Sequence, residues 1–205
     1  GIIIVHPLGV PVNKSKIIEL KTKHNLFVME DCCASVGAKF GDGKNIGTVG
    51  DMSSYSFYFG HQLSTIEGGM INTSNDELYD KLLALRSHGW TKDLSDSSLE
   101  DLRKSVSFDD ENGAFNFIYP GFNLRSTDLQ AYLGLRQIEK AEKVFEGRNK
   151  NHMLYVNMRF LLDFSLLCLH KSQHQLVLQQ HLTDLWLPVG IHHTQPKVVS
   201  LSVSF

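Results

Sequence analysis

The sequence predicts an α/β fold in which a mostly parallel, mixed sheet is flanked by helices. Short apolar runs at residues 2–5 and 26–29 enclose a segment with helical spacing, which makes a strand–helix–strand unit. Further on, an aromatic strand at residues 55–59 is followed by a polar turn, a pair of glycines and a second strand at residues 70–73. A strand–helix–strand unit implies parallel neighbouring strands, and ligands bind at the carboxyl ends of such strands.

The first unit has clear boundaries in the sequence. The apolar run at residues 2–5 ends at a turn that contains a proline and a glycine. Asn13 is placed to cap a helix with apolar residues at positions 17, 18 and 20, and the pair His24-Asn25 ends that helix. The next strand runs into the acidic pair Glu30-Asp31, which we therefore expect at a carboxyl end of the sheet.

Helices and loops alternate after the aromatic strand. A leucine-rich helix starts at Asn75 or Asp76 and stops at Gly89, and residues 91–118 are polar with little periodicity, which indicates an excursion over the surface. A long helix begins near Ser126 or Thr127. We expect its apolar positions to face the core; they are Leu129, Leu133, Leu135, Ile138 and Ala141.

The composition changes near residue 159. Residues 1–159 are interpreted as the central part of one large domain. Residues 160–205 are rich in Leu, His and Gln without a distinct period, so this tail stays unassigned, either as the divergent start of a small domain or as a stretch read out of frame. The chain lacks an initiator methionine and opens in what looks like mid-strand, and we interpret it as a fragment.

Composition and charge narrow the function classes. A hydrophobic content of 42% with 20% charged residues is ordinary for a globular protein. The formal charge of −2 gives no electrostatic case for nucleic acid or an anionic membrane, and no apolar run approaches the ~20 residues that span a bilayer. Three cysteines, two of them adjacent, predict neither a disulfide framework nor an iron–sulfur cluster, and a cytoplasmic location is expected. No metal site is predicted, because the adjacent His192 and His193 have poor metal geometry and no cysteine or carboxylate at ligand spacing.

Three polar residues lie in or just after predicted strands, and each has two interpretations. Asp31 either bonds a ligand or caps a turn. Ser56, five residues before His61, either holds a phosphate together with backbone N–H groups or is satisfied by its neighbours. His61 is either a structural histidine or a proton carrier, a task that imidazole performs near neutral pH.

Three segments resemble the DegT/DnrJ/EryC1/StrS sugar aminotransferases, which are fold type I enzymes that use pyridoxal 5'-phosphate (PLP). The closest resemblance is between Ser56-Phe-Tyr-Phe-Gly-His61-Gln-Leu-Ser-Thr-Ile-Glu-Gly-Gly69 and the cofactor-lysine region of that family. The run Val28-Met-Glu-Asp31, followed by Gly37-Ala38, and the segment Pro120-Gly-Phe-Asn-Leu-Arg125 resemble two further family motifs. The resemblance covers about residues 1 to 158 and implies the large domain of an aspartate-aminotransferase-like fold.

The resemblance implies that three of these residues bind the cofactor. Asp31 matches the aspartate that bonds the pyridine nitrogen of PLP and keeps it protonated. Ser56 has the offset of the family's phosphate-binding serine. Asn123 matches an asparagine that reaches the cofactor phosphate of the partner subunit, so a homodimer with shared active sites is implied. Ala34 departs from the family, which often has glutamine or histidine at that place.

The fourth residue, His61, stands where the aminotransferases of the family carry their lysine. Imidazole cannot form the covalent bond that lysine makes with PLP, and a histidine here is the mark of a small 3-dehydratase branch. The implied reaction removes the C3 hydroxyl of a nucleotide-linked 4-keto-6-deoxyhexose for deoxysugar and O-antigen biosynthesis. PLP and its amine form, pyridoxamine 5'-phosphate (PMP), serve as cofactor, L-glutamate is the amino donor and His61 is the catalytic base.

Three alternatives stay open beside this reaction. The first is an iron–sulfur-dependent CDP-sugar 3-dehydrase, against which the single cysteine after His61 argues. The second is a PLP-dependent sugar aminotransferase, which the histidine disfavours. The third is a noncatalytic PLP-fold protein that acts as a partner subunit.

Overall fold

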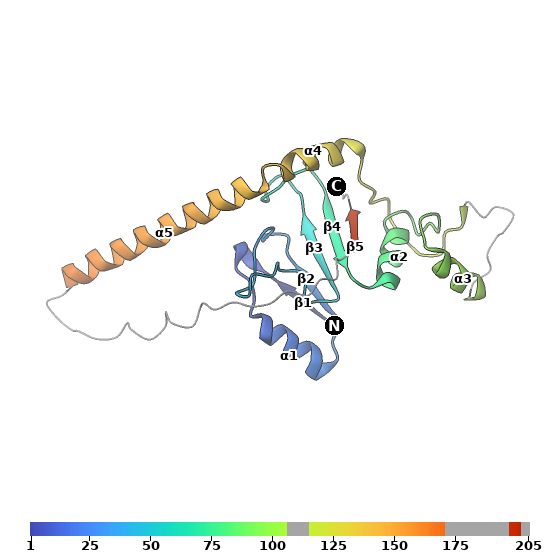
Figure 1. The fold of residues 1–205 in the computed structure, drawn as a ribbon, viewed down its shortest axis with the longest axis horizontal. Coiled ribbons are helices and arrows are strands. Elements are labelled where there is room, and N and C mark those ends of the chain that lie inside the picture. Colours follow the sequence, from blue (N-terminus) through green and yellow to red (C-terminus); the bar gives the residue numbers. More distant parts are fainter. Residues whose placement is uncertain (106–114, 171–196, 202–205) are drawn as a thin grey trace.

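A five-stranded mixed sheet forms the centre of the computed structural model, which describes residues 1–105, 115–170 and 197–201 (Figure 1). The strands lie in the order β1 (Ile2–Val5), β2 (Val28–Asp31), β3 (Met52–Ser56), β4 (Gly69–Thr73) and β5 (Lys197–Leu201). The first three strands pair in parallel, and β4 and β5 pair antiparallel to their neighbours. The predicted mixed sheet is confirmed.

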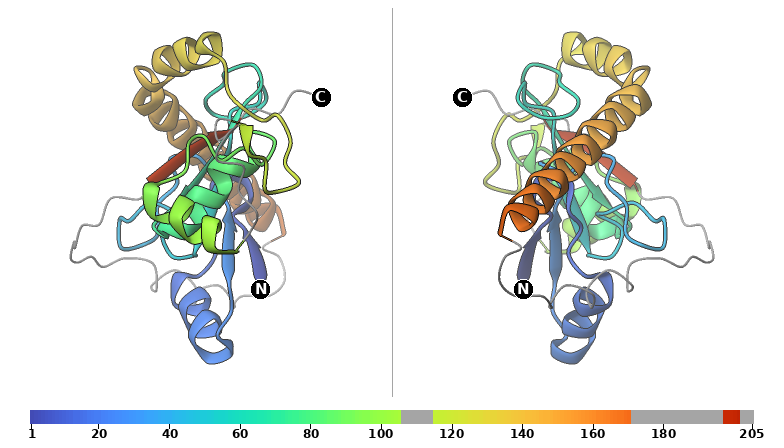
Figure 2. Two further views of the ribbon diagram at one scale, coloured as in Figure 1. Left: turned by 90° about the vertical axis from the view of Figure 1, so that its right-hand side faces the viewer. Right: turned by 90° about the vertical axis from the view of Figure 1, so that its left-hand side faces the viewer.

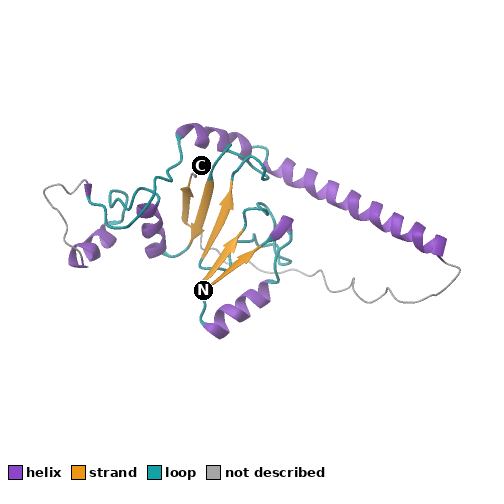
Figure 3. Ribbon diagram, turned by 180° about the vertical axis from the view of Figure 1, so that it is seen from behind, coloured by secondary structure: helices purple, strands orange, loops and turns teal. Residues whose placement is uncertain are grey.

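Helices surround this sheet. They are η1 (Pro7–Gly9), α1 (Lys14–His24), α2 (Asp76–Leu85), α3 (Asp96–Ser105), α4 (Asp128–Ile138) and α5 (Ala141–His170). In Figure 1, α1 lies at the end of the sheet where β1 begins, and α4 crosses near the carboxyl end of β3. The side views show α5 running obliquely past the sheet (Figure 2), and from behind the strands fan out between α1 and α4 (Figure 3).

Capping residues fix the ends of the helices. The side-chain oxygens of Asn13, Asn75 and Thr127 each accept a hydrogen bond from the backbone N–H three residues further on, which begins α1, α2 and α4. Asn25 ends α1 in the left-handed conformation, with φ of 46°. These contacts confirm the predicted starts of all three helices and the predicted end of α1.

The predicted ranges of two strands were wrong by two or three residues. The third strand covers Met52–Ser56 instead of residues 55–59, because the returning strand β4 makes its last pair between Ser56 and Gly69. The second strand covers Val28–Asp31 instead of residues 26–29, because its register with β1 extends to the pair of Val5 with Asp31. The predicted surface excursion at residues 91–118 contains α3, and residues 106–114 of it lie outside the described residues.

The prediction of one long helix from residue 126 was wrong. The chain turns at residues 139–140, which separates α4 from α5. Leu129, Leu135 and Ile138 do not face the core; they are 65%, 64% and 66% exposed. Helix α5 runs past residue 159, so the division of the chain there stays a prediction, and residues 171–196 and 202–205 of the tail lie outside the described residues.

The largest hydrophobic cluster lies around β1, β2 and α1, next to the predicted site. Its buried members are Ile4, Ile17, Val28, Cys32, Phe40 and Ile46. Beside it, Gly37 has φ of 85°, and a Cβ at this position would lie 2.6 Å from the ring of Phe145. Glycine therefore lets α5 pack against the turn that follows β2.

Candidate functional site

Asp31, the last residue of β2, shares one face of the sheet with two serines of β3. Asp31 is paired with Ser54 in the parallel register, and its Oδ1 accepts hydrogen bonds from the Cys33 N–H at 3.0 Å and from Ser54 Oγ at 3.5 Å. Side chains alternate along a strand, so Ser56 lies on the same face as Ser54. A carboxylate and two hydroxyls thus meet at neighbouring strand ends, and sequence reasoning had given Ser54 no role.

The face that carries these groups is open in the part of the chain that the structure describes. Ile3 and Val5 share it through the register of β1 with β2, and they are 66% and 51% exposed. Asp31 and Ser56 are half-buried. A ligand can therefore approach the carboxylate and the hydroxyls from this side.

His61 lies in the loop of residues 57–68, which joins β3 to β4. The base of the loop is closed by hydrogen bonds from Phe57 N to Gly68 O at 2.8 Å and from Thr65 N to Phe57 O at 2.9 Å. The His61 N–H donates to the Tyr58 carbonyl at 3.0 Å, and its half-buried imidazole stands edge-on to the Tyr58 ring, with 5.9 Å between centroids. The histidine is therefore held in a turn just beyond the carboxyl end of β3.

Two glutamines fix this loop to its surroundings. Gln62 Nε2 donates to the carbonyl oxygen of Ala34 at 2.7 Å, in the turn that follows Asp31. Gln130 Nε2, on α4, donates to the carbonyl oxygen of Glu67 at 2.8 Å. The loop that carries His61 is thus attached through Gln62 to the turn after β2 and through Glu67 to α4.

Asn123 has contacts of its own, away from the strand ends of β2 and β3. It forms an isolated bridge with Ser87, and its Oδ1 accepts a hydrogen bond from Arg125 Nε at 3.1 Å. Within the described ranges, no hydrogen bond joins it to Asp31 or to the loop of His61. The structure brings Asp31, Ser56 and the loop of His61 to neighbouring strand ends, whereas Asn123 contacts Ser87 and Arg125.

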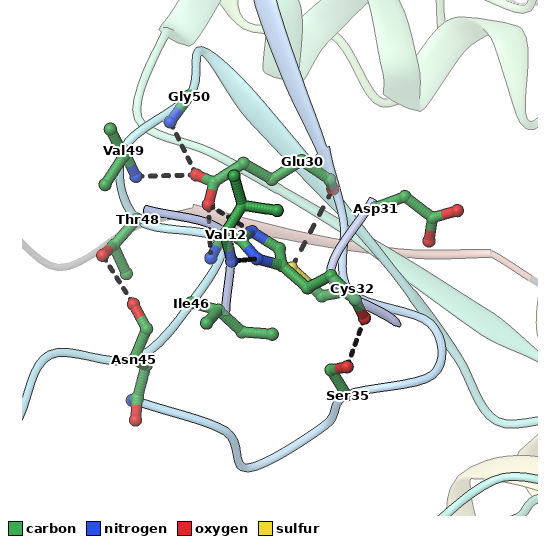
Figure 4. Close-up of polar contacts among 12 residues, drawn as sticks. Val12, Glu30, Asp31, Cys32, Ser35, Asn45, Ile46, Thr48, Val49 and Gly50 are labelled. Atoms are coloured by element: carbon green, nitrogen blue, oxygen red, sulfur yellow. Dashed lines mark hydrogen bonds and ion pairs between the residues drawn. The ribbon is translucent and has the colours of Figure 1, made fainter. Parts of the chain in front are cut away.

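A buried polar network lies on the opposite face of β2. Glu30 and His6 are both fully buried. Glu30 Oε2 accepts hydrogen bonds from His6 Nε2 and Gly47 N, each at 3.0 Å, and Oε1 accepts from Val49 N at 2.7 Å and Gly50 N at 2.6 Å (Figure 4). Sequence reasoning missed this network, because its donors are far from Glu30 in the chain and the acidic pair was the only signal.

Burial keeps the thiols beside the candidate site protonated. Burial, together with the nearby Glu30 carboxylate, raises the pKa of Cys32 to about 12. Burial and a hydrogen bond with Asp31 raise the pKa of Cys33 to about 11. Neither residue is a thiolate at neutral pH, so neither is an activated nucleophile.

Over residues 1–105, 115–170 and 197–201, no three His, Cys, Asp or Glu side chains gather as a metal site. Over the same ranges, no helix combines the length and the apolar character that a membrane span requires.

Two cavities, of about 410 and 780 Å³, lie between α5 and the turn that follows β2. Gln62 lines the smaller cavity, whereas Asp31, Ser56 and His61 line neither. The candidate groups therefore belong to the open face of the sheet and not to an enclosed pocket.

Comparison with known proteins gives one family. The model of the DegT/DnrJ/EryC1/StrS aminotransferase family matches residues 1–194. GDP-4-keto-6-deoxy-D-mannose 3-dehydratase of Yersinia pseudotuberculosis is 35% identical over 155 residues, which are 76% of this chain and 39% of that protein. GDP-perosamine synthase of Caulobacter vibrioides is 34% identical over 150 residues, which are 73% of this chain and 35% of that protein.

A solved structure agrees with these similarities. GDP-4-keto-6-deoxy-D-mannose 3-dehydratase of Escherichia coli, with bound hydrated PLP, superimposes with a TM-score of 0.63 at 32% identity, covering 76% of this chain and 39% of that one. The chain thus spans about two fifths of the length of the dehydratases it matches. This structural similarity confirms the predicted fold class, an aspartate-aminotransferase-like large domain.

Proposed function

Because this chain belongs to the DegT/DnrJ/EryC1/StrS aminotransferase family, we propose that its protein is a PLP/PMP-dependent 3-dehydratase of a nucleotide-linked 4-keto-6-deoxyhexose. One observation carries this proposal. His61, and not a lysine, occupies the loop just beyond the carboxyl end of β3, at the place where the aminotransferases have their cofactor lysine by the resemblance described above. Two relatives named as GDP-4-keto-6-deoxy-D-mannose 3-dehydratases support it.

The residues at the strand ends fit PLP. The Cys33 N–H and the Ser54 hydroxyl both donate to Oδ1 of the Asp31 carboxylate, and Oδ2 is the oxygen proposed to bond the protonated pyridine nitrogen. Ser56 Oγ accepts a hydrogen bond from Tyr58 N at 3.3 Å and keeps its own O–H, which can donate to a phosphate oxygen. Opposite Ser56 stands Gly69, which has no side chain to occupy the space beside the hydroxyl.

Each residue then has a defined task. When bound, PLP supplies an electron sink beside the reacting sugar carbons. Asp31 keeps the proton on the pyridine nitrogen, and Ser56 anchors the phosphate. His61 removes a proton near the reacting centre and gives one to the C3 hydroxyl oxygen, which leaves as water.

The open face of the sheet supports an active site completed by another segment or subunit. Asn123 is exposed, as expected if it serves the site of a partner copy in a homodimer. L-Glutamate is the proposed amino donor, and the proposed location is the cytoplasm. These proposals concern the whole protein, of which the chain spans the part that carries His61.

The experiment uses the complete gene product with PLP, L-glutamate and a GDP-linked 4-keto-6-deoxyhexose. Mass spectrometry of the sugar distinguishes the reactions. A product that has lost one oxygen atom, with release of ammonia, supports the dehydratase. An amino sugar would show an aminotransferase instead, the second candidate, which the 34% identity to GDP-perosamine synthase favours. Cofactor binding without any product would indicate a noncatalytic subunit.

A further inference from the structure

We propose that the buried pair of His6 and Glu30 positions Asp31 by holding the carboxyl end of β2. The proposal rests on the proposed function only for the role of Asp31 toward PLP. Glu30 and Asp31 are consecutive, so their side chains point to opposite faces of the sheet. One residue can therefore anchor the strand end in the interior while the next presents its carboxylate to a ligand.

His6 binds both residues of the acidic pair. Its backbone N–H donates to the Asp31 carbonyl at 3.0 Å, and its ring Nε2 donates to Glu30 Oε2 at 3.0 Å. Ser35 Oγ donates to the carbonyl oxygen of His6 and accepts from the N–H of Gly9 at 2.8 Å. The ends of β1 and β2 and the turn after β2 are therefore linked through one histidine.

The direction of each hydrogen bond follows from the partners. Val12 N–H donates to His6 Nδ1 at 3.0 Å, so this ring nitrogen carries the lone pair and Nε2 carries the proton. Glu30 accepts four N–H bonds, and a carboxylate offers acceptors at both of its oxygens. Inside a buried network, a donor placed where an acceptor is required leaves polar groups unpaired.

The substitution Glu30→Gln makes this change with little alteration in shape. In either orientation, the amide NH₂ of the glutamine faces N–H donors, because both oxygens of Glu30 accept two hydrogen bonds each. The complete gene product without PLP is then compared by amide hydrogen exchange. The informative amides are those of His6 and Cys33, which bond the carbonyl and Oδ1 of Asp31. We expect their exchange to accelerate about tenfold or more, as for the loss of one charge-assisted hydrogen bond.

Asp51→Asn is the matched control. Asp51 Oδ2 accepts the N–H of Val28 at 2.8 Å, at the opposite end of the same strand. Its substitution is expected to accelerate exchange at Val28 and to leave Cys33 unchanged. If Glu30→Gln does not fold, His6→Gln and His6→Leu make the same comparison. Glutamine retains one donor and one acceptor and is expected to stay near the wild type, whereas leucine retains neither.

A second measurement uses PLP. We expect Glu30→Gln to raise the Kd of PLP about tenfold, the effect of a misplaced charge-assisted hydrogen bond to the pyridine nitrogen. We also expect it to shift the pH dependence of the bound-cofactor absorbance. A residue that only stabilised the fold would leave that pH dependence unchanged in the folded variant.

Two outcomes would overturn the positioning role. In the first, Glu30→Gln accelerates exchange only at Gly47, Val49 and Gly50, and the amides of His6 and Cys33 exchange as in the wild type. Glu30 would then anchor only the loop of residues 47–50. The other is a bound cofactor with unaltered affinity and pH dependence. Failure of the wild-type protein to bind PLP would contradict the proposed function instead, and the exchange comparison would still decide the role of Glu30.

Discussion

Gln62 donates a hydrogen bond from Nε2 to the carbonyl oxygen of Ala34 at 2.7 Å, and this bond joins the loop of His61 to the turn that follows Asp31. The bond therefore fixes the position of the loop with His61, the proposed proton carrier, relative to the turn after Asp31, the proposed partner of the pyridine nitrogen. Gln62→Ala removes the bond.

We expect Gln62→Ala to lower kcat about fivefold, because a net loss of about 1 kcal/mol frees the loop from the turn. The affinity for PLP should change little, since Asp31 and Ser56 keep their places. Ser64→Ala, in the same loop, is the control, because its Oγ accepts only the local N–H of Ile66 at 3.0 Å among the described contacts. An unchanged kcat in Gln62→Ala would show that this bond does not position His61.

His61→Asn should lower kcat strongly and leave cofactor binding intact. Asparagine keeps a polar side chain but cannot take up and return a proton at neutral pH, so we expect kcat to fall by about 10² to 10⁴. Steady-state kinetics and a PLP titration of the same preparation separate the two effects. Loss of PLP binding in parallel with activity would mean that His61 is structural.

Ser56→Ala should weaken PLP binding about five- to tenfold through the loss of one hydroxyl donor to the phosphate. Ser54→Ala is the control. It removes a hydroxyl from the same strand and face, but that hydroxyl bonds Asp31 at 3.5 Å and is not proposed to bond the phosphate. The Kd of PLP for the two variants is measured by absorbance titration. Equal weakening by both variants would contradict a phosphate role specific to Ser56.

Ile66→Gly should stabilise the protein. Ile66 has φ of 73°, a conformation that a β-branched residue adopts only under strain, and its side chain is 62% exposed. Relief of this strain exceeds the entropy cost of glycine, so we expect the free energy of unfolding to rise by about 1 kcal/mol. Urea unfolding measures the change, and Ile66→Val, which keeps the branched Cβ, should leave stability near that of the wild type.

The raised pKa values of the Cys32 and Cys33 thiols predict a loss of stability at alkaline pH. The pKa of Cys32 is raised from 9.0 to about 12 and that of Cys33 from 9.0 to about 11, so in the unfolded chain both thiols lose their protons at lower pH than in the fold. The unfolded state then binds fewer protons above pH 9, and the free energy of unfolding falls as pH rises from about 9 to about 12.

Alkylation tests the same prediction at lower pH. With iodoacetamide at about pH 8.5, Cys33 should react about a hundredfold more slowly in the native protein than in urea, because its thiolate fraction is that much smaller. Peptide mapping identifies the modified residue. Equal rates in the two conditions would contradict the raised pKa.

Local sequence signals predicted much of the fold. Asn13, Asn75 and Thr127 cap helices where expected, because capping depends on the few residues at a helix start. The end of β3 at Ser56 depends on where β4 returns, and that partner is not encoded next to the strand. Leu129, Leu135 and Ile138 on α4 have the spacing of a helix face that packs on a core, but they are exposed. The spacing of apolar residues does not show which part of the molecule, if any, covers them.

The candidate site was also predicted only in part. The structure places Asp31 and the loop of His61 at adjacent strand ends, as their positions after predicted strands indicated. Ser56, expected near the start of a strand at residues 55–59, is instead the last residue of β3. The contacts of Ser54 with Asp31, and of His6 with Glu30, depend on pairing between strands far apart in the sequence. Such pairing appears only when the register is known.

The most direct test of the account asks whether the cofactor is held without a lysine. The complete gene product is saturated with PLP, treated with borohydride and examined by mass spectrometry, and a second sample receives L-glutamate while its absorbance is recorded. We predict no covalent adduct between protein and cofactor, together with conversion of the aldehyde form of the cofactor to its amine form by glutamate. An adduct on a lysine would contradict it and would place the protein among the aminotransferases of its family.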